Sequence, residues 1–520
     1  MLETDLQEPV RPRPVAVIDI GTTSIRMAVA EIHSPGVVRQ LDAFSRAVSL
    51  GRDTFHRRKI RRSTIEECVR VLRSYRRVLD EYGIQPAAVR VVATSAVREA
   101  TNRLAFMDRI YIATGLEVEA LEEAEVNRVT YMSIYPHLES RPELSQSRSV
   151  VIEVGGGSTE LLLVRGPNVV YSHTYRLGSL RMRRSIEALR APLARQRELM
   201  ETQIARMIEQ LQSHMAGEER VQLIALGGDL RFAARQLLPD WTPAQLASLP
   251  TERLAKFVNQ LLPASDEELV QRFHISFPDA STLGPALLAN LRVAQALGAE
   301  SLLVSSANLR DGLLQEMAAR DEWSANFAKQ ITRSAIDLAG KYDSDLKHVR
   351  HVASLAVKLF REIRQEHQLP SSYEVLLNVA ALLHDVGRYV NVRSHHKHSM
   401  YLIRNSELFG LGNRDMLITS LVARYHRRAT PQPNHEGYAM LPRVQRVAVA
   451  KMAAMLRVAI ALDESRSQRI TDFHCVVKEN QLVITIRHAK DLSLEQMAIR
   501  QDNGMFEEVF GLRVLLRPQG

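Results

Sequence analysis

One short pattern occurs twice in the first part of the chain, and it constrains the fold more than any other feature. In its first copy, Asp19-Ile-Gly-Thr-Thr-Ser24 follows the apolar run VAVI, and in its second copy, Glu153-Val-Gly-Gly-Gly-Ser158 follows SVVI. Both copies read acid-x-Gly-x-x-Ser and lie between two apolar, strand-like segments. Repetition of the same device predicts two duplicated half-domains that face each other.

The segments around the two copies alternate between strand and helix patterns. Residues 15–32 read as an apolar strand, a Gly/Thr turn and a second apolar strand. Residues 63–83 begin at a suitable cap, Ser63, and carry apolar positions at helical spacing. Residues 89–102 read as a strand that runs into a helix. This alternation favours an α/β architecture for the first part of the chain.

Beyond about residue 320 the pattern changes. Residues 324–470 look wholly helical, with long amphipathic runs, and the segment after them returns to strand-like alternation. A chain of 520 residues is too long for one hydrophobic core. At the usual size of about 100–200 residues per domain, we expect three or four domains.

Composition narrows the class of protein. Apolar residues make up 45% of the chain and charged residues 24%, which is ordinary for a soluble globular protein. No run of about 20 apolar residues predicts a membrane span, and the amino terminus lacks an apolar signal core. Cys68 and Cys475 form neither a disulfide framework nor a metal cluster, so we expect a cytoplasmic protein.

The charge of the chain points to a polyanionic partner. The net charge is +9, and basic residues gather in two segments. These segments contain Arg52, Arg57, Arg58, Lys59, Arg61 and Arg62, and then Arg176, Arg181, Arg183 and Arg184. Only 5% of residues are aromatic, which argues against base stacking and a specific nucleic-acid partner. A phosphate polymer fits this composition, and two solvated surfaces are the alternative.

Both Gly-rich turns are suited to hold phosphate. Glycine lets a phosphate approach exposed backbone N–H groups, and Thr and Ser hydroxyls add neutral donors. A carboxylate at the strand end would repel phosphate unless it holds Mg²⁺, so we expect Asp19 and Glu153 to be the Mg²⁺ ligands. The predicted phosphate-binding residues of the turns are Gly21, Thr22, Thr23, Ser24, Gly155, Gly156, Gly157, Ser158 and Thr159. A ligand-free hairpin is the alternative for either turn alone.

A third Gly-rich turn, Gly227-Gly228-Asp229, also follows an apolar strand. In a two-lobed fold it would close the floor of the cleft or contact a nucleotide, and Gly227 and Gly228 join the predicted phosphate-binding set. Taken alone this turn is a weak signal.

The ordered set of motifs resembles the exopolyphosphatase/guanosine-pentaphosphate phosphohydrolase family, within the sugar kinase–Hsp70–actin superfamily. The resemblance covers nearly the whole chain. The matching pieces are Asp19-Ile-Gly-Thr-Thr-Ser-Ile-Arg26, Ala93-Thr-Ser-Ala-Val-Arg98 with Asn102, Gly155-Gly-Gly-Ser-Thr-Glu160, Leu177-Gly-Ser179, Gly227-Gly228, Leu309-Arg-Asp-Gly-Leu-Leu314, His395-His-Lys-His-Ser-Met-Tyr-Leu-Ile-Arg-Asn405 and Val422-Ala-Arg-Tyr-His-Arg427.

The resemblance implies a fold and a division into domains. It implies two actin-like (RNase H-like) half-domains that form a cleft, then an all-α HD-like domain and a small C-terminal α+β domain. The expected ranges are 1–138 and 139–320 for the half-domains, 321–470 for the HD-like domain and 471–520 for the last domain. It also implies a homodimer.

The resemblance further implies an enzyme that releases terminal orthophosphate from inorganic polyphosphate with Mg²⁺. Arg98 would supply charge to the phosphoryl oxygens. The family's catalytic glutamate lies in a Glu-Glu-Ala-Arg segment, which aligns with Glu125-Val-Asn-Arg128, so Glu125 would orient or deprotonate the attacking water. Glu160 is the second carboxylate positioned to assist.

Three alternatives stay open. The same site would hydrolyse guanosine pentaphosphate, or the chain would be a catalytically weak polyphosphate or alarmone sensor, or a nucleotide phosphohydrolase would work through the helical domain. The sensor is suggested by departures from the family pattern: Glu153 replaces an aspartate and Val126 a glutamate, while Asp229 stands where a small polar residue is usual. A sugar or acetate kinase is disfavoured, because an HD-like domain is foreign to kinases.

The helical region carries the beginning of an HD-type metal site. His348 and the pair His384-Asp385 match its first ligands. In the segment where the last aspartate ligand is expected, Ile460 stands at the ligand position. We therefore predict a degenerate HD site that assists dimerisation and binding of long polyphosphate. Substitute ligands would have to come from other histidines of the region, namely His395, His396, His398 and His426.

Overall fold

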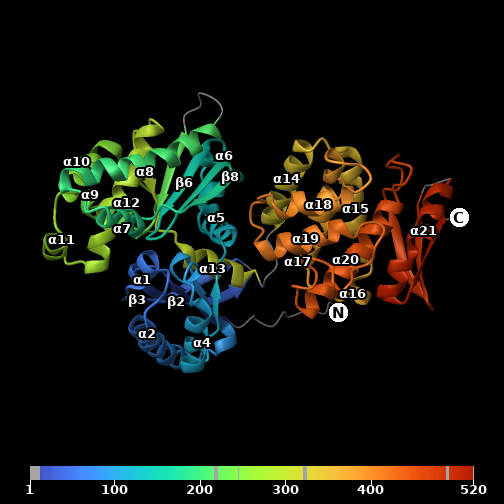
Figure 1. The fold of residues 1–520 in the computed structure, drawn as a ribbon, viewed down its shortest axis with the longest axis horizontal. Coiled ribbons are helices and arrows are strands. Elements are labelled where there is room, and N and C mark those ends of the chain that lie inside the picture. Colours follow the sequence, from blue (N-terminus) through green and yellow to red (C-terminus); the bar gives the residue numbers. More distant parts are fainter. Residues whose placement is uncertain are drawn as a thin grey trace, which may run out of the picture. The chain divides into compact units, whose positions relative to one another are not determined.

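The computed structural model describes residues 12–34, 36–215, 221–243, 245–319, 325–487 and 491–518. The chain divides into two compact units, Met1–Asp321 and Glu322–Gly520, and each is described by itself (Figure 1).

The first unit begins with a five-stranded sheet in the order β3-β2-β1-β4-β5. The neighbours β1/β2 and β2/β3 are antiparallel, whereas β1/β4 and β4/β5 are parallel. The central strand β1 is buried on both faces over Val15–Ile20, which explains its unbroken apolar run. The strands are β1 (Arg13–Ile20), β2 (Ser24–Ser34), β3 (Val37–Ala47), β4 (Val89–Ala93) and β5 (Val118–Ala120).

Helices cover both faces of this sheet. One face packs on α2 and α4 through a core that contains Leu72 and Phe106. The opposite face packs on α5 and α13 through Val129 and Leu313. The helices of this half are α1 (Leu50–Arg57), α2 (Arg62–Glu81), α3 (Ser95–Arg98), α4 (Arg103–Thr114) and α5 (Glu123–Ser140), joined by α13 (Leu309–Ala318) from the end of the unit.

A second sheet, of six strands, has the order β10-β11-β9-β6-β7-β8. Its strands are β6 (Arg148–Val154), β7 (Thr159–Arg165), β8 (Asn168–Tyr175), β9 (Val221–Leu226), β10 (Ala247–Pro250) and β11 (Ser301–Val304). Its helices are α6 (Pro142–Ser145), α7 (Ser179–Ala188), α8 (Leu193–Ser213), α9 (Gly228–Leu237), α10 (Thr251–Leu261), α11 (Asp266–Phe273) and α12 (Phe277–Ala296). One large apolar core joins these elements.

The two sheets repeat one topology. The order β3-β2-β1-β4-β5 corresponds to β8-β7-β6-β9-β11, with antiparallel hairpins on one side and parallel strands on the other. In both copies the backbone N–H of the turn glycine donates to the serine carbonyl at 2.9 Å, Gly21 to Ser24 and Gly155 to Ser158. The predicted pair of half-domains is confirmed by this equivalence. Figure 1 shows α5 and α13 between the two halves.

Helices α5 and α13 cross at a close contact. A Cβ atom on Gly312 of α13 would lie 2.2 Å from the carbonyl oxygen of Val129 on α5. Nearby, the Glu316 carboxylate pairs with Arg90 of β4 at 2.6 Å and with Arg128 of α5 at 2.7 Å. The glycine permits the approach, and the shared carboxylate ties both helices to the first sheet.

The second unit is helical up to residue 461 and then forms a small sheet. Its order is β12-β13-β14, with β12/β13 antiparallel and β13/β14 parallel through the crossover helix α21. This agrees with the predicted helical region followed by α+β structure. The elements are α14 (Ala325–Lys341), α15 (Leu346–Glu362), α16 (Arg364–His367), α17 (Ser372–Leu383), η2 (Val386–Tyr389), α18 (His395–Arg404), α19 (Asn413–Arg424), α20 (Arg443–Ala461), β12 (Phe473–Lys478), β13 (Gln481–Ile486), α21 (Ser493–Phe510) and β14 (Arg513–Pro518). The finer division of each unit near residues 138 and 470 stays a prediction.

The close contact at Gly312 leads to a test of stability. Alanine is the better helix former by about 1 kcal/mol, but its Cβ would meet backbone that cannot move aside as a side chain can. We expect Gly312→Ala to lower the free energy of unfolding by about 1–2 kcal/mol, measured by denaturant titration. Gly504→Ala is the control, because a Cβ there meets nothing within 4 Å in a helix. A stabilised Gly312→Ala protein would contradict the packing.

Candidate active site

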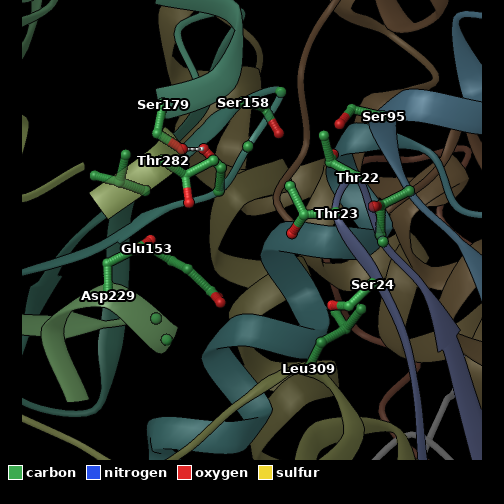
Figure 2. A pocket seen from close by; sticks show the side chains of 18 of the residues that line it. Thr22, Thr23, Ser24, Ser95, Glu153, Ser158, Ser179, Asp229, Thr282 and Leu309 are labelled. Carbon is green, nitrogen blue, oxygen red and sulfur yellow. Dashed lines mark hydrogen bonds between the residues drawn. The ribbon is translucent and has the colours of Figure 1, made fainter. Parts of the chain in front are cut away.

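The two equivalent hairpin turns lie on opposite sides of one cavity of about 320 Å³. Figure 2 shows Thr22, Thr23 and Ser24 on one side, with Glu153 and Asp229 facing them. The predicted residues that line the cavity are Asp19, Gly21, Thr22, Thr23, Ser24, Glu153, Gly155, Gly156, Gly157, Ser158, Glu160, Gly227 and Gly228. Sequence reasoning thus placed these residues in a common site, while their individual roles stay predictions.

Glycines bring the turns of the two halves into contact. A Cβ on Gly156 would lie 2.8 Å from Cγ2 of Thr22, and a Cβ on Gly157 would lie 2.3 Å from Oγ of Ser95. Gly178 approaches from the other side, since its Cβ would lie 2.4 Å from the backbone of Gly157. The Gly156–Gly157 turn therefore packs directly on side chains of the first half and on the backbone at Gly178, and a Cβ atom at any of these three glycines would clash.

Three carboxylates that belong to the two hairpins line this cavity. Asp19 ends β1, and Glu153 and Glu160 face each other across the β6/β7 hairpin. Burial raises the pKa of Asp19 and of Glu153, and the charge of Asp19 further raises the pKa of Glu153. Asp19 Oδ2 lies 3.6 Å from the Arg310 guanidinium. Its Oδ1 is buried and has no hydrogen-bond partner among the described residues. A buried carboxylate oxygen without a hydrogen-bond partner, close to a second carboxylate, is suited to bind a cation.

The third of these carboxylates, Glu160, also has a raised pKa. Burial, and then the charge of Glu153, raise the pKa of Glu160 to about 7. The Ser158 hydroxyl donates to Glu160 Oε1 at 2.6 Å and fixes the orientation of the carboxyl group. Glu160 is therefore held beside the Gly-rich turn of the second half in an environment that favours proton uptake.

Cations balance these carboxylates. Arg26 lies opposite Asp19 in the β1/β2 register, at the place that Glu160 takes opposite Glu153 in the second half. The charges of Arg310 and Arg26 oppose the rise that burial causes in the pKa of Asp19. The charge of Arg231 opposes the rise in the pKa of Glu153 in the same way. None of these arginines was among the predicted site residues. Side chains two positions apart on a strand lie on the same face of the sheet, so the predicted site residue Ser24 was the signal that could have identified Arg26.

Three of the predicted site residues, Arg98, Thr159 and Glu125, do not line the cavity. Arg98 donates from Nη1 to the carbonyl of Leu121 at 2.8 Å. The Thr159 hydroxyl is buried and donates to the carbonyl of Leu177. These two side chains therefore hold backbone in place.

Glu125 also points elsewhere. Its Oε2 accepts the backbone N–H of Glu122 at 2.8 Å and completes a capping box at the start of α5. The next residue, Val126, lines the cavity in its place. The assignment of Glu125 as the residue that acts on water therefore finds no support in this geometry. A glutamate three residues into a helix is the sequence signal for such a box.

The first basic segment forms a cavity of its own, of about 340 Å³. Its lining includes Arg52, His56, Arg57 and Arg61 from the first half and Arg184 from the second. Arg61 pairs with the buried Asp53 at 2.6 Å, but Arg52 and Arg57 form no ion pair with any described residue. Two basic segments far apart in the sequence thus meet at one surface.

The second basic segment is largely engaged in ion pairs. Arg181 and Arg176 both bind Glu99 of the first half, at 2.6 and 2.5 Å. The Arg181 guanidinium also lies 4.2 Å above the Phe55 ring and donates to the Gly157 carbonyl. Arg183 and Arg184 bind Glu187. Ion pairs within the protein therefore account for most of the positive charge of this segment.

In the second unit, His348, His384 and Asp385 lie together, as the HD-like pattern predicts. In the sequence pattern, the position expected for the last ligand is occupied by Ile460, which cannot bind a metal. Asp463, three residues later, is the carboxylate that reaches His348, at 2.7 Å. None of the helices in the described ranges combines the length and hydropathy needed to cross a membrane.

Comparison with known proteins gives concordant matches over both units. Residues 28–321 match the Ppx/GppA phosphatase family, and residues 331–504 match domain III of Ppx/GppA phosphatases. A guanosine-5'-triphosphate,3'-diphosphate pyrophosphatase from Photobacterium profundum is 22% identical over 95% of this chain and 97% of its own length. A pyrophosphatase of the same name from Aeromonas hydrophila is 24% identical over 91% and 92%.

A solved structure supports the fold of the first unit. The exopolyphosphatase from Cytophaga hutchinsonii aligns with a TM-score of 0.53 and 19% identity, over 59% of this chain and 98% of that one.

Proposed function

The chain belongs to the Ppx/GppA phosphatase family, and from this premise we propose that it releases terminal orthophosphate from inorganic polyphosphate by Mg²⁺-assisted attack of water. The observation that carries the proposal is the cavity between two Gly-rich turns, which Asp19, Glu153 and Glu160 line together. We further propose that the protein is a homodimer, as the family resemblance implies, and that it is cytoplasmic, in line with its two isolated cysteines.

The two turns would bind successive phosphates of the chain end. The backbone N–H groups of Gly156 and Gly157 and the hydroxyls of Thr22 and Thr23 would be the neutral donors to phosphate. Arg26 lines the same cavity and adds a positive charge. These groups orient the terminal phosphorus towards the carboxylate side of the cavity.

The residues fit a divalent cation. Asp19 Oδ1 has no protein partner in the described ranges although it is buried, and oxygen ligands are those that Mg²⁺ prefers. Asp19 and Glu153 would hold the ion, which neutralises charge on the phosphate oxygens when bound. The arginines near these two carboxylates limit the repulsion between them.

We assign the base to Glu160. The attacking water gives a proton to Glu160 as its oxygen forms a bond to the terminal phosphorus. The bridging P–O bond breaks, and the shortened polyphosphate leaves as an anion. Burial, the largest cause of its raised pKa, favours proton uptake by Glu160, and the Ser158 hydrogen bond keeps its carboxyl group in place.

Guanosine pentaphosphate is the second candidate substrate, because the cavity also has an apolar end. Phe232, Ile275 and Leu283 line it beside Asp229 and Asp279. Apolar side chains suit a purine ring, and carboxylates accept hydrogen bonds from the N–H groups of guanine. The names of the curated relatives are consistent with this alternative.

One assay separates these functions. Phosphate release is measured in parallel from long polyphosphate, tripolyphosphate and guanosine pentaphosphate with Mg²⁺. We expect the highest kcat/KM on polyphosphate. A higher value on guanosine pentaphosphate would favour the second candidate. Binding of polyphosphate without release of phosphate from any substrate would favour a weak sensor, which the replacement of a family glutamate by Val126 suggests.

A single substitution tests the base. Glu160→Gln keeps the size of the side chain but removes its ability to accept a proton. We expect the rate of phosphate release to fall at least about 100-fold, which corresponds to about 2.7 kcal/mol. Glu125→Gln is the matched control and should stay within about threefold of the wild-type rate, because an amide oxygen still caps the helix. The opposite ranking of the two variants would return the base to Glu125.

The surface cavity near α1 is expected to bind the distal part of long chains. Arg52→Glu with Arg57→Glu should raise the KM for long polyphosphate about tenfold or more and leave that for tripolyphosphate within about twofold. Arg70→Glu with Arg77→Glu is the control, because these exposed arginines of α2 lie outside that cavity. Equal effects on both substrates would remove this surface from the path of the chain.

A further inference from the structure

Five buried side chains meet inside the helical unit. His348 lies on α15, His384 and Asp385 end α17, His395 begins α18, and His426 follows α19. They form two groups, the first with His348, His384 and Asp385 and the second with Asp385, His395 and His426. Within each group, one potential ligand atom of every residue lies within 4.8 Å of the others. None of the five residues is more than 5% exposed.

The backbone determines which nitrogen is free on three of these histidines. Nδ1 of His384, His395 and His426 lies 2.7, 2.8 and 2.6 Å from the carbonyl oxygen of the residue three positions earlier. A carbonyl only accepts hydrogen bonds, so Nδ1 carries the proton and Nε2 keeps its lone pair. Metal-binding histidines are oriented in the same way.

Two of these lone pairs face each other. Nε2 of His395 lies 3.0 Å from Nε2 of His426. Two acceptors at this distance repel unless a cation binds both. A metal ion about 2.1 Å from each nitrogen spans the separation at nearly a right angle. Asp385 Oδ1 lies 3.5 Å from the same His395 nitrogen and supplies negative charge.

The first group is built on the other side of Asp385. Asp385 Oδ1 lies 3.8 Å from Nε2 of His384. Nδ1 of His348 is bound to Asp463 at 2.7 Å, which leaves Nε2 of His348 available. A carboxylate that holds a histidine in this way is common behind metal ligands. Arg457 donates to the carbonyl oxygens of Tyr425 and Ala429, and so fixes the loop that contains His426.

We propose that the helical unit binds two divalent transition-metal ions bridged by Asp385, and that this pair binds a phosphate group. Imidazole and carboxylate ligands together favour manganese, iron, cobalt or zinc over magnesium. Three protein ligands for each ion leave coordination positions for water or an anion. This proposal departs from the degenerate site predicted from the sequence, because His395, His426 and Asp463 complete the cluster.

The charge around Asp385 selects the class of ligand. Asp385 Oδ2 lies 3.2 Å from the Arg466 guanidinium and 3.5 Å from that of Arg388. Both side chains are more than 40% exposed, so they connect the buried carboxylate with solvent. Arg427 lies 3.4 Å from His395. Once metal ions bind Asp385, the guanidiniums of Arg388 and Arg466 are free to bind the oxygens of a phosphate ester or anhydride.

The metal content of the tag-free full-length protein tests the first part. The metal-free protein is loaded with Mn²⁺ or Co²⁺, desalted and analysed by inductively coupled plasma mass spectrometry. We expect about two ions per chain. His426→Gln should lose about one ion, since glutamine keeps the hydrogen bond to the Ala423 carbonyl but replaces the imidazole ligand. Asp385→Ala should lose both ions, and circular dichroism verifies that each variant is folded.

His398→Ala is the matched control, because His398 lies on the same helix and outside both groups. It should retain the wild-type content. The proposal is overturned if the folded wild-type protein retains no transition metal, or if His426→Gln retains as much as the wild type. A protonated His395–His426 pair without metal is then the explanation of the short nitrogen distance.

Inorganic phosphate tests the second part. Mn²⁺ bound near phosphate broadens its phosphorus NMR resonance. We expect broadening with the wild-type protein to exceed that with His426→Gln, and Arg388→Ala with Arg466→Ala to weaken the phosphate affinity responsible for the excess about tenfold. Equal broadening by the wild-type and His426→Gln proteins would exclude phosphate binding at this metal pair.

Discussion

The first unit depends on a contact that only glycine permits. The turn at Gly156 and Gly157 packs on Thr22 and Ser95 of the other half, with Gly178 against its opposite side. Because the glycines of this turn carry no side chains, their backbone N–H groups can lie beside the cavity. Both the binding surface and the association of the half-domains therefore follow from the same packing, and a methyl group at these positions would disturb both.

The topology and the two turns were predictable from the sequence because they depend on local patterns. A turn between two apolar strands forms from neighbouring residues, and its repetition reports the duplication directly. Helix faces are harder to predict. Successive residues of a helix differ by about 100° in direction, so a shift of one position moves a side chain from cavity to cap. Glu125 and Val126 illustrate this difference, and the spacing from Glu122 to Glu125 is the local signal for the cap.

The helical unit sets a different limit. His348 and Asp463 are 115 positions apart in the chain and meet at 2.7 Å, which no local pattern can indicate. The sequence offered four further histidines without a means to choose among them, and the folded chain brings only His395 and His426 to Asp385. Charge clusters have the same limitation. Arg52 and Arg57 stay unpaired among the described residues, whereas Arg176 and Arg181 are neutralised by a glutamate from the other half.

That glutamate, Glu99, joins the two half-domains through ion pairs, so separating the half-domains would require these pairs to break. A rotation that moves α7 away from the first sheet breaks two ion pairs at one carboxylate and lifts Arg181 from the Phe55 ring. Arg176 is 65% exposed, so dissolved ions compete for its share of this latch. The strength of this ion pair therefore depends on the salt concentration. A polyanion that binds Arg176 would compete with Glu99 for the same guanidinium, and so would weaken one of the ion pairs that join the two halves.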